Sequence, residues 1–418
     1  MRCLDTQCCI AGGGPAGVML GYLLARAGVR VVVLEKHADF LRDFRGDTVH
    51  PSTLTVMHEL GLLQRFLQLP HQKLDRLEGW IEEEHVRIAD FSGLRVPCPY
   101  IAFMPQWDFL DFLAGEARRL DGFQLLQRAE VTDLVRSGGR ITGVVAQTPD
   151  GPLTVRAPLT VGTDGRHSTV RERAGLRRKD IGAPIDVLWF RVARDPSTFD
   201  HAFTHVRGGR ILITLDRGDY WQCAYVIAKG SFDAVKAQGL EAFRESAART
   251  APALREHLAQ LRSWDEVKLL TVAVDRLQTW SAPGLLCIGD AAHAMSPVGG
   301  VGINLAIQDA VATANLLADK LREGRVTDAD VARVQARREF PTVVTQGFQV
   351  RAQNLLKPLL DGGRSPARAP LPMRLLSHWP WLRHQAARFV GLGVRPEHVA
   401  SPDRRVQPVA SAAGAPGG

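Results

Sequence analysis

The first 35 residues alternate between apolar runs and a glycine cluster, a pattern that predicts a strand, a helix and a second strand. Residues 7–11 are apolar and run directly into glycines, and residues 15–27 carry apolar side chains at helical spacing. Gly28 stands where a helix commonly ends, and residues 29–34 (VRVVVL) are typical of a strand buried on both faces. Together these elements predict a βαβ unit of about 30 residues.

The rest of the chain also mixes strands with helices, and we find no internal repeat. Helices are predicted over residues 52–69, 106–120, 238–262 and 331–360, with a further one that follows a glycine-rich turn and ends near 323. Strands are predicted within 76–104, 123–161, 184–227, 267–274 and 284–290. A loop is expected over 361–374 and a disordered tail from about 401.

Composition narrows the class of protein. Hydrophobic residues make up 45% of the 418 residues and charged residues 23%, values that exclude a disordered chain and a polytopic membrane protein. The net charge of +8 comes from scattered basic residues rather than a basic block, so we expect no nucleic-acid partner. The six cysteines include no CxxC pair, which favours a reducing compartment, the cytoplasm, and no metal site is expected.

The uncharged stretch 8–25 has the length of a signal peptide. Glycines and a proline at 12–15 interrupt it near its start, and Asp5 spoils the basic segment that a signal peptide needs. We therefore expect neither a signal peptide nor stable membrane insertion.

Three glycines with the spacing GxGxxG follow the first strand, at Gly12, Gly14 and Gly17. Such glycines let a strand turn sharply, let the backbone approach a pyrophosphate and let helix and strand pack closely. Glu35 ends the second strand, where a carboxylate accepts both hydroxyls of an adenosine ribose and repels a phosphorylated one, so FAD or NAD is favoured over NADP as the nucleotide bound here. The predicted nucleotide-binding residues of this unit are Gly12, Gly14, Pro15, Ala16, Gly17, Glu35 and Lys36.

A second motif, GDAAHAMSPVGGVGIN, occupies residues 289–304. A carboxylate at a strand end, followed by a glycine-rich helix start, suits a polyol beside an electron-rich ring, since free N–H groups stabilise negative charge. His293 is either a catalytic residue or a buried residue that holds the turn together, and we favour the second. The predicted cofactor-binding residues here are Asp290, Gly299, Gly300, Val301, Gly302, Ile303 and Asn304.

A third segment, DGRHSTVR, begins at Asp164 and Gly165 after a predicted strand. An Asp-Gly turn with Ser and Arg at a helix start is common in isolation. In this position it is a candidate for contact with both a cofactor and a reductant.

In this order, GGGPAG with Glu35, DGRHSTVR and GDAAHAMSPVGGVGIN resemble the class A flavoprotein monooxygenases, the para-hydroxybenzoate hydroxylase-like family. The resemblance covers discontinuous blocks of residues 7–345. It implies non-covalent FAD, NAD(P)H as a reductant without a domain of its own, and O2 as co-substrate. It further implies FAD contacts from Arg45 and Gln106, a ribitol contact from Asp290, and a catalytic position for Pro297 near the flavin edge where oxygen reacts.

The resemblance implies an α/β fold, with a Rossmann-like FAD-binding domain of the GR2 type, an inserted antiparallel β-sheet substrate domain and C-terminal helices. The expected domains are a discontinuous FAD-binding domain (1–75, 105–177 and 268–345), a substrate domain (76–104 and 178–267), a C-terminal helical segment (346–400) and a disordered tail (401–418).

The implied reaction is hydroxylation of an aromatic or polyketide-like small molecule through a C4a-hydroperoxyflavin. We expect no thioredoxin-like domain of the kind that the longer phenol hydroxylases carry, and no tyrosine pair that would activate a phenol can be aligned. The substrate, any side-chain base and a homodimer stay open. The aromatic residues of the predicted substrate sheet are expected to be core more often than pocket; they are Trp189, Phe190, Phe203, Tyr220, Trp221 and Tyr225.

Two alternatives keep the fold. One is an FAD-dependent reductase or dehydrogenase without oxygen insertion, of the geranylgeranyl-reductase or halogenase type, although the halogenase signature WxWxIP is absent. The other is a non-enzymatic binding protein. The GD…GVGIN segment argues against this second alternative, because a mere binding protein would not need it.

Overall fold

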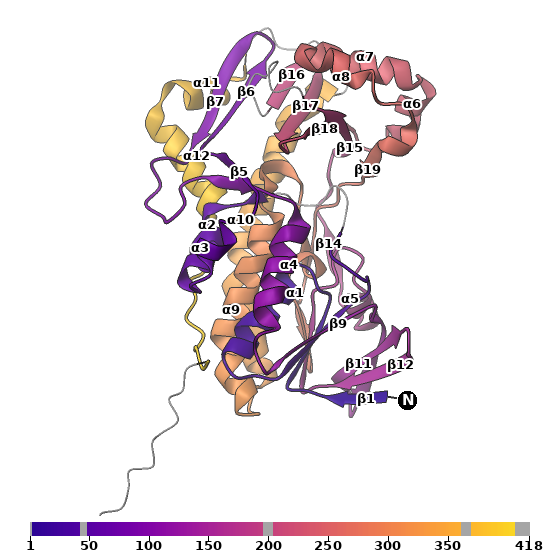
Figure 1. Ribbon diagram of the computed structural model, residues 1–418, viewed down its shortest axis with the longest axis vertical. Helices are drawn as coiled ribbons and strands as arrows, with labels where there is room; N and C mark the ends of the chain where they lie inside the picture. The colour runs from indigo at the N-terminus through magenta and orange to yellow at the C-terminus, as the bar shows by residue number, and fades with distance from the viewer. Residues whose placement is uncertain (1, 42–47, 195–203, 361–368, 406–418) are drawn as a thin grey trace, which may run out of the picture.

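A computed structural model describes residues 2–41, 48–194, 204–360 and 369–405. A mainly parallel sheet with helices forms one end of the molecule and a large antiparallel sheet forms the other (Figure 1). The predicted α/β fold class is thereby confirmed.

The parallel sheet is built from short strands that are almost wholly buried, as their β-branched and apolar residues predict. Ile10 lies opposite Val33 on one neighbour and Val161 on the other. Only the first strand of the sheet is antiparallel to its neighbour. The order is β21 (Ser281–Ala282), β22 (Leu285–Cys287), β13 (Leu159–Gly162), β2 (Cys8–Ala11), β3 (Val31–Glu35) and β9 (Phe123–Gln127).

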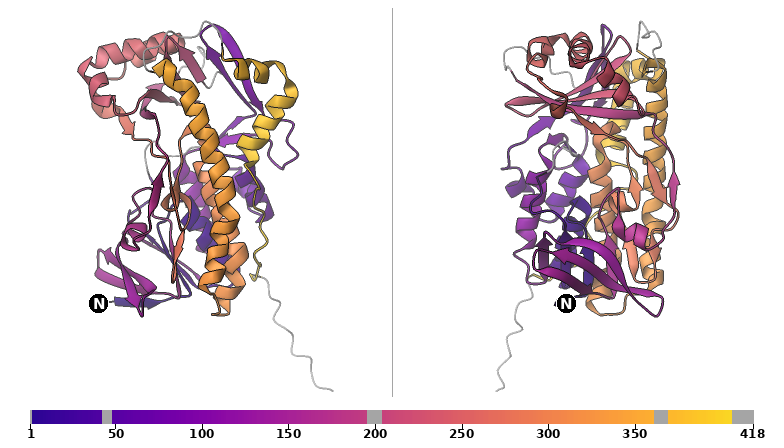
Figure 2. Two further views of the ribbon diagram at one scale, coloured as in Figure 1. Left: turned by 180° about the vertical axis from the view of Figure 1, so that it is seen from behind. Right: turned by 90° about the vertical axis from the view of Figure 1, so that its right-hand side faces the viewer.

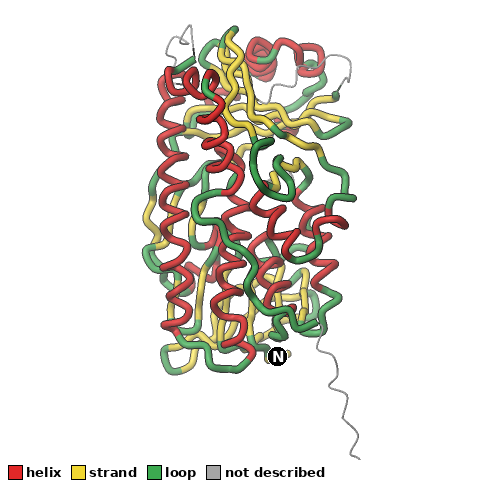
Figure 3. The backbone as a smooth tube through the Cα atoms, turned by 90° about the vertical axis from the view of Figure 1, so that its left-hand side faces the viewer, coloured by secondary structure: helices red, strands yellow, loops and turns green. Residues whose placement is uncertain are grey.

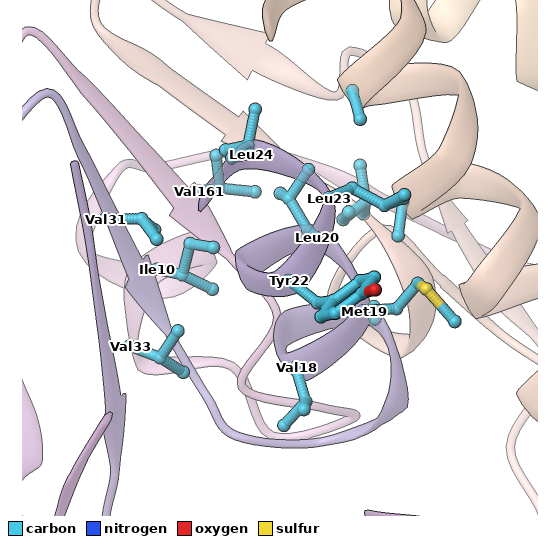
Figure 4. Close-up of a cluster of buried hydrophobic side chains, with 14 of the residues drawn as sticks. Ile10, Val18, Met19, Leu20, Tyr22, Leu23, Leu24, Val31, Val33 and Val161 are labelled. Carbon is cyan, nitrogen blue, oxygen red and sulfur yellow. The ribbon is translucent and has the colours of Figure 1, made fainter. Parts of the chain in front are cut away.

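Helices cover one face of this sheet. Helix α1 (Pro15–Arg26) lies between the strands and the helices α4 (Gln106–Ala117) and α9 (Gly302–Arg322), and nearly all of α1 is buried. Figure 4 shows strand residues such as Ile10 and Val161 beside the apolar side chains of α1. This packing explains why α1 is apolar around its whole circumference rather than along one stripe.

A smaller sheet covers the other face through contacts of its third strand with β13. Its order is β1 (Arg2–Asp5), β12 (Gly151–Arg156), β11 (Arg140–Thr148) and β10 (Glu130–Ser137), with helix α5 (Thr169–Arg173) beside it. Two further three-stranded sheets join the two ends of the molecule. One is β4 (Thr48–Val49), β8 (Ile101–Phe103) and β5 (Gln72–Leu74), and the other is β14 (Arg178–Asp180), β20 (Asp275–Leu277) and β23 (His293–Ala294).

The large sheet has seven strands and two apolar faces. Its order is β19 (Lys268–Leu270), β15 (Ile185–Ala193), β18 (Tyr220–Ala228), β17 (Arg210–Asp216), β16 (Thr204–Arg207), β6 (Arg76–Ile81) and β7 (Glu84–Asp90). Every pairing is antiparallel except that of β16 with β6. The outer face is covered by α6 (Phe232–Ala237), α7 (Leu240–Thr250) and α8 (Arg255–Leu258).

One long helix, α10 (Asp328–Leu360), spans from the end of the molecule that carries the parallel sheet to the seven-stranded sheet (Figure 2). The expected domain boundary at residue 345 falls inside it. Two shorter helices, α11 (Leu371–His378) and α12 (Pro380–Leu392), pack against β7. Figure 3 shows them at the end of the molecule that carries the large sheet.

Two predicted helices are shorter than expected. The helix over 52–69 is two helices, α2 (Pro51–Glu59) and α3 (Leu63–Phe66), because Gly61 between them takes a φ of 71°. The helix over 238–262 is interrupted after α7, where Pro252 has no N–H to continue it.

The C-terminal region also differs from the prediction. The expected loop over 361–374 is wrong in its last part, because α11 begins at Leu371; residues 361–368 lie outside the described residues. Prolines signal a loop in the sequence, but in α11 one stands in the first helical turn, where its missing N–H costs nothing. The expected disorder is wrong for 401–405, since Arg404 donates its N–H to Arg26 O and Arg26 pairs with Asp403. The remainder of the tail, 406–418, lies outside the described residues.

Candidate functional site

The glycine turn after β2 passes too close to its neighbours for any side chain. Gly12 has a φ of 109°, and a Cβ there would lie 2.4 Å from the carbonyl oxygen of Thr163. A Cβ on Gly17 would lie 2.0 Å from the carbonyl oxygen of Gly12. Thr163 adds a hydroxyl that donates to Gly12 O at 2.7 Å. The turn is therefore closed from two sides, and the role of Thr163 was not foreseen from the sequence.

The start of α1 is open by contrast. Gly14 is the N-cap, Pro15 begins the helix, and no other atom lies within 4 Å of the place where a Cβ on Gly14 would stand. No side chain caps this helix end. Its first N–H groups and the positive end of its dipole are therefore uncovered at Gly14, an arrangement that suits a pyrophosphate.

Glu35 fixes the far side of the same turn. Its Oε2 accepts the N–H of Gly13 at 2.9 Å, and its Oε1 accepts the N–H of His37 at 3.0 Å. The side chain is buried, while the next residue, Lys36, is exposed. Glu35 stands at the end of β3, the position from which a carboxylate binds the hydroxyls of an adenosine ribose in such a βαβ unit.

In the DGRHSTVR segment the carboxylate of Asp164 forms hydrogen bonds within the protein. Asp164 accepts the hydroxyl of Ser168 at 2.5 Å and the N–H of Val170 at 3.0 Å, which caps α5. Burial raises the pKa of Asp164 above its usual value. Gly165 follows with a φ of 82°. The structure thus gives this carboxylate a helix-capping role.

Arg171 joins the second and third motifs. It is buried and donates to the carbonyl oxygens of Ala291 at 3.0 Å and Arg166 at 2.6 Å. One guanidinium thereby holds the DGRHSTVR loop against the turn that carries Asp290.

The turn at Gly289 is also in contact with the first motif. Gly289 has a φ of 59°, and a Cβ there would lie 3.3 Å from the Cβ atoms of Ala16 and Ala306. Asp290 follows directly, half-buried, at the end of β22. The three motifs, which are far apart in the sequence, therefore form one cradle around the start of α1.

A buried charge cluster supports this turn from behind. Asp309 of α9 accepts the N–H of Gly289 at 3.1 Å, Nε2 of His293 at 2.6 Å and Nε of Arg338 at 2.9 Å. Burial alone would raise the pKa of Asp309, but His293 and Arg338 outweigh it and leave the pKa below its usual value. His293 is 1% exposed, which confirms the interpretation of this residue as one that holds the turn together.

The glycine-rich loop at 297–304 leads into the open end of α9. Gly299 and Gly300 have φ values of 79° and 63°, and Gly300 donates to Pro297 O at 3.0 Å. The first hydrogen bond of α9 runs from Leu305 N to Val301 O, so the N–H groups of 302–304 lie at the free end of the helix. This end can stabilise the negative charge that a reduced flavin carries.

The side chain of Asn304 is used to hold the loop. Its Oδ1 accepts the hydroxyl of Thr53 at 2.6 Å and the N–H of His50 at 3.1 Å. Thr48 donates to Gly300 O at 2.8 Å. Both contacts connect the loop to the segment around α2, and neither was foreseen from the sequence.

Three glutamines of α10 support the preceding segment. Gln346 donates to Ala294 O at 3.0 Å, Gln349 donates to Ser296 O at 2.9 Å and Val298 O at 2.8 Å, and Gln353 donates to the hydroxyl of Ser296. These three glutamines were not foreseen from the sequence. Their spacing of i, i+3 and i+7, which places three buried amides on one helix face, is the signal that could have found them.

Three further predicted residues are Gln106, Arg45 and Phe203. Gln106 begins α4 and is half-buried. Arg45 and the aromatic candidate Phe203 lie outside the described residues.

The large sheet separates its aromatic residues between its two faces. Phe190, Trp221 and Tyr225 are packed into the apolar cluster under α7 and α8, which confirms the expectation of core for these three. Trp189 instead belongs to the inner cluster, together with Val298 of the glycine-rich loop. Alternation along β15 explains the split, because neighbouring residues point to opposite faces.

The inner face continues across the sheet in register with Trp189. Trp189 pairs with Ala224, and Ala224 pairs with Ile213. At the edge of this row Gln222 is buried and accepts Nε of Arg217 at 3.3 Å, while the guanidinium of Arg191 stacks on Tyr220 at 5.0 Å. The face is therefore apolar at its centre and polar at one rim.

A small cavity of about 30 Å³ lies behind the glycine-rich loop, between α9, α10 and α12. It is lined by Val298, Val301, Phe348 and Phe389, with the buried side chains of Gln308 and Arg338 among its polar groups. This volume suits one or a few water molecules rather than a substrate.

The chain resembles known proteins in both sequence and fold. Residues 5–346 match a family model described as an FAD binding domain. The chain is 32% identical over 388 residues to 6-methylpretetramide 4-monooxygenase from Streptomyces rimosus, which covers 92% of both chains. It matches the structure of the OxyS anhydrotetracycline hydroxylase from Streptomyces rimosus with a TM-score of 0.71 and 26% identity, over 94% of this chain and 77% of that one.

The structure of PqsL from Pseudomonas aeruginosa in complex with 2-aminobenzoylacetate matches with a TM-score of 0.73 and 23% identity, over 85% of this chain and all of that one, and shows the same fold. The chain spans only 59–61% of the length of four further curated relatives.

One helical stretch, Val298–Arg322, is long and apolar enough to cross a membrane, but 83% of its most apolar window is buried inside the protein, as expected of a core helix.

Proposed function

Since the chain belongs to the FAD binding domain family and is an FAD-dependent monooxygenase, we propose that it hydroxylates a planar polycyclic aromatic polyketide in the cytoplasm, with NAD(P)H and O2. The observation that carries the proposal is the single cradle formed by the three motifs, closed by the contact of Arg171 with Ala291. The relative named as a 6-methylpretetramide 4-monooxygenase supports the substrate class.

The cradle fits FAD at three places. The open start of α1 beside Gly14 suits the pyrophosphate, the Glu35 carboxylate suits the ribose, and Asp290 suits the ribitol. The free end of α9 at 302–304 would face the flavin ring. When bound and reduced by NAD(P)H, FAD supplies the activation of O2, and the chain's own work is to bind, orient and keep out water.

The inner face of the large sheet supports the choice of a flat apolar substrate. Trp189, Ala224 and Ile213 form a row in register, and Trp189 shares its cluster with Val298 of the glycine-rich loop. A planar ring system can stack on such a row while the rim at Arg191 and Gln222 meets its polar substituents. We assign the substrate domain to residues 76–104 and 178–267 on this basis.

The first test is the purified protein with FAD added. We expect the absorbance bands of a bound flavin and their loss in Asp290→Ala, with the fold retained. A protein that stays colourless at saturating FAD contradicts the cradle.

The second test is turnover. NAD(P)H consumption is followed with a panel of aromatic polyketides and simple phenols under ¹⁸O2, and products are weighed by mass spectrometry. We expect one labelled oxygen atom in a polyketide product and little stimulation by phenols. A product that has lost two hydrogens and carries no label would instead support the reductase or dehydrogenase alternative.

A further inference from the structure

Most of the large apolar side chains that the described part of the chain exposes lie in its C-terminal third. Nine are exposed, and seven of them fall within residues 340–381. The four on α11 and its junction with α12 are Leu371 (65% exposed), Leu375 (38%), Trp379 (58%) and Trp381 (68%). We call these four residues the α11–α12 patch.

The helices that carry the patch pack by other residues. Helix α11 has no buried residue, and α12 buries Ala387 and Gly391. Leu371 and Leu375 are one helical turn apart and share a face. Two tryptophans at this helix junction are more than half exposed. Contact between such large apolar side chains and water is unfavourable, and exposed apolar patches of this kind mark interaction sites.

On the segment that carries the patch, residues 371–395, basic residues outnumber acidic ones. From Leu371 to Arg395 the sequence has four arginines and neither Asp nor Glu. On the adjoining β6 and β7 the acidic groups Glu78, Glu84 and Asp90 are paired with arginines. Their side chains are 22–31% exposed, whereas those of the partner arginines are 39–57% exposed. The side chains of these arginines are therefore more exposed than those of their acidic partners, although Glu83 at the β6–β7 turn and Asp75 directly before β6 are also exposed.

A cavity of about 200 Å³ opens beside the patch. It is lined by Arg76, Arg87 and Arg383, with Asp90 as the acidic group among them. Arg383 lies one helical turn after Trp379, donating its own N–H to Trp379 O at 3.3 Å and its guanidinium to Ser377 O at 2.6 Å. Three guanidinium groups around one cavity can hold a phosphate by paired hydrogen bonds.

We propose that the α11–α12 patch and this arginine cavity form one surface that binds the face of an anionic phospholipid membrane. The tryptophans and leucines enter the interfacial layer, where Trp side chains are favoured, and the cavity receives a lipid phosphate. Four apolar side chains are too few for insertion, so binding is reversible. A second copy of this chain is disfavoured as the occupant, because a symmetric contact would bring the arginines of both copies together.

The test uses the full chain loaded with FAD and vesicles of phosphatidylcholine alone or mixed with phosphatidylglycerol. We expect the protein to co-sediment with the mixed vesicles and to be released by salt. Trp379→Ser with Trp381→Ser should weaken this binding roughly tenfold. Arg76→Gln and Arg383→Gln should each weaken it about fivefold.

Two control variants carry matched changes elsewhere. Leu269→Ser alters an exposed leucine on β19, and Arg156→Gln alters an exposed arginine on β12. Both should bind vesicles as the unchanged protein does. Flavin content and melting temperature should be equal in all variants, which separates this surface from the FAD site and from the proposed function.

Three results would overturn the proposal. One is absence of binding to the mixed vesicles, including the case in which inorganic phosphate alone raises the melting temperature through the arginine cavity. Another is equal binding by the tryptophan or arginine variants. The third is a dimer in solution that dissociates in the double tryptophan variant, since a second copy would then be the occupant.

Discussion

The FAD cradle is formed mainly by backbone atoms, whereas the inner face of the seven-stranded sheet is formed by side chains. In the cradle, backbone atoms approach so closely that Gly12 and Gly17 admit no side chain, and a few polar groups hold each turn. On the sheet, apolar side chains such as Trp189 and Ile213 form the surface, and their backbone pairs in a regular ladder. The shape of the cradle thus depends on positions where no side chain can be added, and the shape of the sheet surface depends on the side chains that are present.

This difference has a consequence for function. A site that binds an invariant cofactor can rely on backbone N–H groups and helix ends, whose positions leave little freedom. A site that selects among substrates needs side chains that can change without disturbing the fold. Substitutions should therefore be nearly all-or-none in the glycine turn of the cradle and graded on the sheet.

The largest effect is expected for Gly17→Ala. The new Cβ would lie 2.0 Å from Gly12 O, so α1 and β2 cannot keep their contact. We expect loss of soluble, flavin-loaded protein, measured by yield and by flavin absorbance. Gly115→Ala is the matched control in a helix, because nothing lies within 4 Å of its Cβ, and it should keep FAD and gain about 0.5–1 kcal/mol of stability.

Gly14→Val tests whether the pyrophosphate lies beside the start of α1. Nothing lies within 4 Å of its Cβ in the protein, so the chain should fold, yet the side chain would fill the space assigned to the pyrophosphate. A folded protein that no longer binds FAD is expected from circular dichroism and a flavin titration. Normal FAD binding by this variant would place the pyrophosphate elsewhere.

Asp309→Asn comes next, because it removes a charge rather than a backbone contact. It removes one of the two carboxylates paired with the buried guanidinium of Arg338, which keeps Glu397 at 3.6 Å. We therefore expect a cost of about 3 kcal/mol of stability, the lower end of the range for a broken buried ion pair. Urea unfolding measures this loss. Asp319→Asn on the exposed side of α9 is the control and should change stability by less than about 1 kcal/mol.

The same residue predicts a pH dependence. The pKa of Asp309 is lower in the folded chain than in the unfolded one, so the unfolded chain takes up protons first as the pH falls. The stability that Asp309 contributes is complete above the ordinary aspartate range and is lost below about pH 4. Asp309→Asn should therefore show a shallower loss of stability in acid than the unchanged protein, and an identical slope would contradict this role.

These contacts show which parts of the site a sequence can predict. The GxGxxG turn, the GD turn and the Asp-Gly turn each carry a local pattern of glycines and carboxylates, so the cradle is visible before the chain is folded. Thr163 and Asp309 support the same turns although neither belongs to one of these motifs. No local pattern identifies them, because each acts through a contact that exists only in the folded protein.

The antiparallel sheet was predicted in outline but not in detail. Alternation along β15 places Trp189 and Phe190 on opposite faces, yet the sequence does not say which face lies toward the cofactor. The segment 361–374 was harder to predict, since prolines that suggest a loop instead stand at the start of α11. In both regions tertiary packing decides the outcome, and local propensity does not.

A smaller effect is expected for Asp290→Asn than for any change in the glycine turn. The amide keeps the shape of the side chain and loses the charge-assisted hydrogen bond assigned to the ribitol. We expect FAD affinity to fall about tenfold, measured by flavin fluorescence titration, with thermal stability of the FAD-free protein unchanged. A larger fall in the stability of the FAD-free protein would assign Asp290 to the fold instead of the cofactor.

The smallest effect, and the one that best separates the two regions, is expected on the sheet itself. Trp189→Leu removes an aromatic surface from the inner face and should raise KM for a polycyclic aromatic substrate about fivefold while FAD binding stays normal. Phe190→Leu, one residue away on the outer face, should instead lower stability by about 1–2 kcal/mol and leave KM unchanged. Because the two residues are adjacent in β15, equal effects on KM would mean that the substrate does not lie on the inner face, and the graded selectivity assigned to this sheet would have to come from another element.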